Sequence, residues 1–146
     1  IAHHAQSWPR VLDYGCGSGI LAIGAARHGA RDIDAVDIDA AAVEATRANA
    51  SANAVALNAA TPELADGTYA LVLANILAKP LTLLAPLLSA HVASGGHLVL
   101  AGILERQIDE LCTAYAPWLL LDVQDREDGW VLMVGQRDTA NGRDTR

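Results

Sequence analysis

Apolar and polar residues follow one another in blocks along the chain, and these blocks predict strands and helices in alternation. Short and nearly continuous apolar runs, such as 69–74, are typical of strands that are covered on both faces. Longer segments that carry one apolar stripe, such as 80–92 with its leucines, are typical of amphipathic helices. On this basis we predict strands at 10–14, 32–37, 54–57, 69–74 and 97–101, and helices at 19–28, 40–53, 80–92 and 105–115.

The end of the chain has a different pattern. Two further strands, 119–124 and 130–136, flank the charged segment 125–129 and predict a hairpin. Small polar residues over 137–146 predict a disordered tail, and residues 1–9 are interpreted as the end of a helix and a linker. Alternating strands and helices predict an α/β fold with a parallel sheet, to which the hairpin adds one antiparallel strand. We therefore expect a single domain over 1–136.

A turn rich in glycine follows the first strand. Gly15, Gly17 and Gly19 alternate with other residues between the apolar strand and the next helix. Glycine allows the backbone to take positive φ and allows a ligand to approach without meeting a Cβ atom. Because the first N–H groups of a helix have no partner inside the helix, they are available to a ligand. The pattern predicts that a nucleotide-like ligand binds over this turn.

The details of the turn favour a cationic ligand. Dinucleotide sites have the spacing G-x-G-x-x-G, whereas the glycines here follow G-x-G-x-G and position 20 is Ile. Asp13, two residues before the first glycine, would repel a pyrophosphate. The same carboxylate would attract S-adenosylmethionine (SAM), which carries a sulfonium and an ammonium group. The sequence therefore favours SAM over NAD.

A second acidic residue supports this interpretation. Asp37 ends an apolar strand and lies 20 residues after Gly17. At this spacing a carboxylate reaches the hydroxyls of a ribose, which both of its oxygens can bind. We count Ile38 with it among the cofactor-binding residues, and we predict that Asp39 caps the following helix.

Two asparagines are candidates for further contacts, and we count both among the cofactor-binding residues. Asn75 follows the strand 69–74, where its side-chain carbonyl could accept a hydrogen bond from an amine and direct the amine lone pair at a methyl donor. Methyl transfer is an in-line displacement, so such positioning would supply much of the rate. The alternative is that Asn75 caps the next turn. Asn58 follows the predicted strand 54–57 and is a candidate contact for adenine, with an ordinary loop residue as the alternative.

Composition narrows the function classes. The length of 146 residues suits one domain with a substantial core, and the net charge of −7 argues against direct binding of nucleic acid. No apolar run has the length of a membrane span, no signal-peptide pattern is present, and no Cys or His pair has the spacing of a metal site. Two cysteines fit a reduced compartment, so we expect a cytoplasmic protein.

Three segments together resemble class I SAM-dependent methyltransferases, and within them the bacterial ribosomal protein L11 methyltransferases. These are the glycine turn, the segment 36–49 and the segment 74–78, with 95–104 continuing the match. The resemblance implies a Rossmann-like sheet of seven strands with the hairpin strand antiparallel. It further implies N-methylation of lysine side chains and of an N-terminal amine on a ribosomal protein. Asp13 and the three glycines would surround the methionine part of SAM, Asp37 would bind the ribose, and Asn75 would meet the amine.

The same resemblance implies a small N-terminal domain that binds the protein substrate, and a Gly/Thr/His-rich segment before the first strand. This sequence contains neither, so we expect the chain to bind SAM and to methylate its protein target weakly. Three alternatives stay open at this point. They are a methyltransferase for small-molecule amines, a nicotinamide-dependent oxidoreductase, and a domain that only binds the cofactor.

Overall fold

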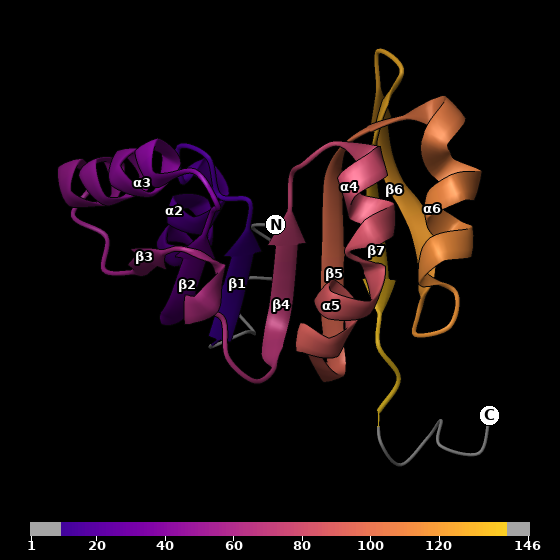
Figure 1. The fold of residues 1–146 in the computed structure, drawn as a ribbon, viewed down its shortest axis with the longest axis horizontal. Coiled ribbons are helices and arrows are strands. Elements are labelled where there is room, and N and C mark those ends of the chain that lie inside the picture. Colours follow the sequence, from indigo (N-terminus) through magenta and orange to yellow (C-terminus); the bar gives the residue numbers. More distant parts are fainter. Residues whose placement is uncertain (1–9, 140–146) are drawn as a thin grey trace.

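A seven-stranded sheet forms the centre of the computed structural model, which describes residues 10–139 (Figure 1). The strands follow the order β3-β2-β1-β4-β5-β7-β6. Neighbouring strands among the first five are parallel, whereas β7 runs antiparallel to both β5 and β6. Their bounds are β1 (Arg10–Tyr14), β2 (Asp32–Val36), β3 (Asn58–Ala60), β4 (Tyr69–Ala74), β5 (Val92–Leu104), β6 (Leu120–Glu127) and β7 (Trp130–Gln136). The prediction of a mostly parallel sheet with one antiparallel strand is confirmed.

Helices cover both faces of this sheet and create two apolar clusters. The helices are α2 (Ile20–Arg27), α3 (Ala40–Ala52), α4 (Ala78–Leu83), α5 (Ala85–His91) and α6 (Ile108–Tyr115), with 3-10 turns η1 (Pro62–Leu64) and η2 (Glu105–Gln107). Side chains of α2 and α3 pack in one cluster with Val11 of β1, and side chains of α4, α5 and α6 pack in the other with Leu12. Successive residues of a strand point to opposite faces, so one short strand contributes to both clusters.

A buried polar network joins the amino ends of the central strands. Asp34 is 5% exposed, and its carboxylate accepts hydrogen bonds from the Tyr69 hydroxyl at 2.6 Å and from the Asn58 side-chain amide at 3.1 Å. The Arg10 guanidinium lies 3.7 Å from the same carboxylate. Because each of these groups has a partner, a carboxylate can be buried here.

The predicted strand 54–57 is wrong. Ala54 takes a positive φ of 55° in the turn that ends α3, and the backbone N–H of Val55 returns to Ala50. This turn delays the start of β3 to Asn58. The connecting residues 54–57 therefore belong to a loop.

Other boundaries also differ from the predictions. The helix predicted at 80–92 is two helices, because Pro86 has no N–H with which to continue α4. The strand predicted at 97–101 extends over the whole of β5, and the hairpin turn shrinks to Asp128 and Gly129, both with positive φ, as two-residue hairpin turns require.

Arg137, which the sequence predicts to lie in a disordered tail, is held in place. Its backbone exchanges hydrogen bonds of 2.8 Å with Gly95 and Gly96, and its guanidinium donates to the backbone oxygen of Ser89 at 2.6 Å. Ordered structure thus continues beyond 136. The interpretations of 1–9 as helix and linker, and of 140–146 as tail, lie outside the described residues.

Candidate active site

The carboxyl ends of β1, β2 and β4 border a pocket of about 600 Å³. In open parallel sheets this edge is where ligands bind. Three predicted site residues, Gly15, Asp37 and Ile38, line the pocket, and among the lining residues within 10–139 the only charged group is the Asp37 carboxylate. The remaining lining residues are Tyr14, Ile76, Leu77, Pro80, Leu83 and Leu84.

The glycine turn has the backbone conformation that its sequence predicts. Gly15, Gly17 and Gly19 have φ values of 76°, 56° and 87°, in the region that L-residues avoid. A Cβ atom on Gly19 would lie 2.8 Å from the Thr46 methyl, whereas a Cβ on Gly17 would have no neighbour within 4 Å in the described part of the chain. Gly19 therefore serves close packing, while Gly17 presents its backbone to open space.

Asp37 is fixed at the rim of the pocket by the backbone. One carboxylate oxygen accepts from the Gly17 N–H at 3.0 Å and the other from the Asp39 N–H at 2.9 Å. Since each carboxylate oxygen has two lone pairs, both oxygens keep capacity for a further donor. Asp39 itself caps α3 by accepting from the Ala41 N–H at 2.9 Å, which confirms that prediction.

Asp13 is buried at the end of β1. It is 1% exposed, and neither carboxylate oxygen has a hydrogen-bond partner within the described residues. Burial raises the pKa of Asp13 from 3.8 to about 7, and repulsion from Asp37 adds to this shift, while the nearby Ala22 backbone amide opposes it. An unpaired buried carboxylate is a costly feature that a positive charge nearby would relieve.

Two side chains of α3 hold the glycine turn, and the sequence interpretation missed both. The hydroxyl of the fully buried Thr46 donates to the Gly17 carbonyl at 3.0 Å and lies 3.2 Å from the Cys16 sulfur. The Asn49 amide donates to the Ser18 carbonyl at 2.9 Å. One signal was available, because Thr46 is a polar residue three positions after buried Val43, where the helix period predicts an apolar one.

Replacing Thr46 by Val should weaken SAM binding. Valine keeps the shape of threonine but cannot donate to the Gly17 carbonyl, so the glycine turn loses one of the hydrogen bonds that hold it. A neutral hydrogen bond contributes about 0.5–1.5 kcal/mol, which predicts roughly a 2- to 13-fold rise in Kd by calorimetry. Thr46→Ser keeps the hydroxyl and should bind SAM like the unaltered protein. Equal losses in the two variants would contradict the role of the hydroxyl.

The two candidate asparagines lie in different places. Asn75 directly follows β4 at the carboxyl edge, and its side chain is exposed. Asn58 opens β3 and pairs in register with Asp34, two residues before the end of β2. Its amide binds the Asp34 carboxylate. The prediction that Asn58 follows its strand at the carboxyl edge is therefore wrong, because the residue is the first of β3.

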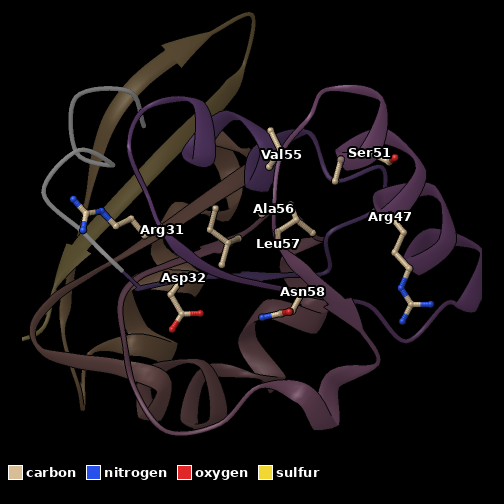
Figure 2. Close-up of a pocket in the computed structure, with 10 residues that line it drawn as sticks. Arg31, Asp32, Arg47, Ser51, Val55, Ala56, Leu57 and Asn58 are labelled. Carbon is tan, nitrogen blue, oxygen red and sulfur yellow. The ribbon is translucent and has the colours of Figure 1, made fainter.

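A second pocket, of about 480 Å³, lies at the opposite end of β2 and β3 (Figure 2). Arg31 and Arg47 are at opposite sides of it in this view. The Arg47 guanidinium donates to the Ala59 carbonyl at 2.7 and 3.1 Å and binds Glu44 at 3.0 Å. The Asn58 amide, also in the lining, binds the Asp34 carboxylate.

Residues 10–139 contain neither a membrane-spanning helix nor a metal-binding cluster. No helix in this range is long and apolar enough to cross a membrane. No group of three or more His, Cys, Asp or Glu side chains in the same range could hold a metal ion.

The fold is the Rossmann-like fold of class I methyltransferases. The structure aligns with a magnesium protoporphyrin IX methyltransferase from Synechocystis PCC 6803 with bound SAM at a TM-score of 0.68 and 18% identity. That alignment covers 88% of this chain and 70% of the other and supports the fold.

More specifically, the chain belongs to the ribosomal protein L11 methyltransferase (PrmA) family, whose family model matches residues 2–138. A ribosomal protein L11 methyltransferase from Polaromonas sp. is 71% identical over 124 residues, which are 85% of this chain and 42% of that protein. The crystal structure of a ribosomal protein L11 methylase from Lactobacillus delbrueckii subsp. bulgaricus has a TM-score of 0.85 and 32% identity, covering 94% of this chain and 74% of that chain. The chain spans about two fifths of the length of the curated relatives that it matches.

Proposed function

We propose that this chain is the SAM-binding, catalytic part of a protein N-methyltransferase that acts on lysine and N-terminal amines of ribosomal protein L11. The family match over 2–138 carries the proposal. Two free cysteines are consistent with the cytoplasm as the place of this reaction.

The chemistry of the pocket supports SAM as the cofactor. The methyl group of SAM is activated by the positive charge on sulfur. A pocket that is apolar apart from one acidic side chain suits this cationic ligand. Asp37 would accept hydrogen bonds from the ribose hydroxyls. Ile38 is 85% exposed at the pocket, and bound adenosine would bury its side chain. Gly15, Gly17 and Gly19 would let the methionine part approach the backbone. The buried charge of Asp13 would favour the cationic groups.

Asn75 is proposed to hold the acceptor. Its side-chain carbonyl would accept a hydrogen bond from the incoming neutral amine, leaving the lone pair directed at the methyl group. The residue stands at the end of β4, beside the lining residues Ile76 and Leu77, so an amine there would meet the pocket from its edge. Orientation of this kind contributes to rate without any covalent step by the protein.

Transfer of tritiated methyl groups from SAM to purified ribosomal protein L11 tests the proposal. We expect incorporation into the protein and a roughly 100-fold lower kcat for Asn75→Ala, since misplacement of a reacting group has effects of this size. Asn58→Ala, a change of the same residue type at the other end of the sheet, should keep its kcat. Transfer to small amines but not to ribosomal protein L11 would contradict the proposed substrate, and SAM binding without any transfer would contradict catalysis.

A further inference from the structure

The segment that follows β4 is enclosed by two glycines from the neighbouring strands. β4 lies between β1 and β5, and Asn75 and Ile76 are the first residues beyond its end. On one side, a Cβ atom on Gly15 would collide with the Ile76 side chain. On the other side, a Cβ atom on Gly102 would lie 2.6 Å from the Asn75 side-chain oxygen. Such close approach is possible only because both positions lack a side chain.

Gly102 occupies a bulge in β5. The pairing of β5 with β7 shifts register between Leu100 and Ile103, so Ala101 and Gly102 together face one residue of β7. Gly102 has a φ of 77°, which is the conformation of the glycine in a common type of bulge. Bulges of this kind redirect the chain next to active sites. Here the bulge brings a bare backbone against the carboxamide of Asn75.

This close approach places the Asn75 oxygen on the β5 side of the segment that follows β4. Ile76 lines the pocket on the side of β1, whereas Asn75 turns towards β5 and is absent from the lining. The amide is exposed, so solvent and an incoming amine can reach it. Two successive residues thus face different sides, with Ile76 lining the cofactor pocket and the Asn75 side chain lying towards β5.

We propose that Gly102 is a positioning residue for the acceptor amine, because the space above its Cα atom sets the orientation of the Asn75 carboxamide. This inference rests on the proposed function, in which Asn75 holds the amine. A side chain at position 102 would push the carboxamide out of this space and towards the path of the amine. The amine would then be misaligned, while the contacts proposed for SAM, on the other side of Ile76, would stay.

Gly102→Ala tests this inference, and the chain offers a matched control. Gly129 also has a positive φ, of 84°, but a Cβ atom there would meet nothing within 4 Å. Gly129→Ala therefore reproduces the backbone strain without the collision. In the natural full-length protein, we expect Gly102→Ala to lower kcat for the amine substrate about 10- to 100-fold. The Kd for SAM should stay within about 2-fold of its original value. Gly129→Ala should change neither quantity.

A double-mutant cycle with Asn75→Ala separates positioning from general damage. Once the carboxamide is gone, Gly102→Ala should lower kcat no further, whereas additive losses would overturn the inference. Equal losses of kcat in Gly102→Ala and Gly129→Ala would overturn it as well.

Two readouts do not depend on catalysis. The Asn75 side-chain amide should shift in the NMR spectrum of Gly102→Ala and not in that of Gly129→Ala. Asn75→Ala should also restore part of any drop in melting temperature caused by Gly102→Ala, because it removes the colliding atoms. An unchanged amide resonance would refute the contact. If the unaltered protein transferred no methyl group, the proposed function would fail, while these readouts would still decide whether Gly102 orients Asn75.

Discussion

Asp13→Asn is expected to stabilise the protein at pH 8 in the absence of SAM and, at the same time, to weaken SAM binding. The carboxylate is buried without a hydrogen-bond partner in the described residues, and this burial raises the pKa of Asp13 to about 7. At pH 8 the native protein therefore contains a buried negative charge that asparagine would remove. The shape of the side chain would stay nearly the same.

The sign of the pH dependence follows from linkage. Because the pKa of Asp13 is higher in the folded protein than the 3.8 of the unfolded chain, the folded state binds the proton more tightly. The contribution of Asp13 to stability is fully present below pH 3.8 and is lost as the pH rises through about 7. A shift of this size corresponds to on the order of 4 kcal/mol. Urea unfolding at pH 4 and pH 8 should therefore show a variant that gains stability only at the higher pH.

SAM affinity should depend on pH in the opposite direction to stability. A cation bound near the turn favours the ionised form of Asp13. In the unaltered protein, SAM affinity should therefore rise with pH up to about pH 7. In Asp13→Asn this rise should be smaller. S-adenosylhomocysteine lacks the positive charge on sulfur and serves as the matched ligand, since Asp13→Asn should weaken its binding less. Equal losses for the two ligands, or a variant that is less stable at every pH, would refute this account of Asp13.

The parts of the site that sequence analysis predicted are those set by local signals. The glycine turn, the acid at the end of β2 and the cap at Asp39 each depend on residues a few positions apart, and the structure has them as expected. The prediction for Asn58 fails because a loop over 54–57 separates α3 from β3, although α3 itself ends within a residue of its predicted end. Ala54 turns the chain there with a positive φ, which alanine seldom adopts, so the sequence contains no local signal for this loop.

The contacts that the sequence could not reveal join segments far apart in the chain. Thr46 and Gly17 are 29 residues apart, and Asn75 and Gly102 meet only because β4 and β5 are neighbours. Neither pair has a periodic pattern or a spacing of its own. Strand order and the bulge in β5 create them, so they required the structure.

Asp37→Ala should give the largest loss of SAM affinity among the variants considered. Its carboxylate stands at the rim of the pocket and is proposed to bind the ribose hydroxyls. It also accepts the N–H groups of Gly17 and Asp39, so its removal takes away one hydrogen bond that holds the glycine turn as well as the ligand contacts. Hydrogen bonds to a charged group contribute about 1.5–3 kcal/mol, which predicts a Kd increase of roughly 10- to 150-fold by calorimetry.

The neighbouring acid provides the control for this variant. Asp39 bears the same charge two residues away, but its side chain caps α3 and does not line the pocket. Asp39→Ala should therefore lower stability by about 1 kcal/mol, as the loss of a helix cap does, and leave SAM affinity nearly unchanged. Equal losses of SAM affinity in the two variants would contradict direct contacts by Asp37. The effect would then come from the negative charge that both residues carry.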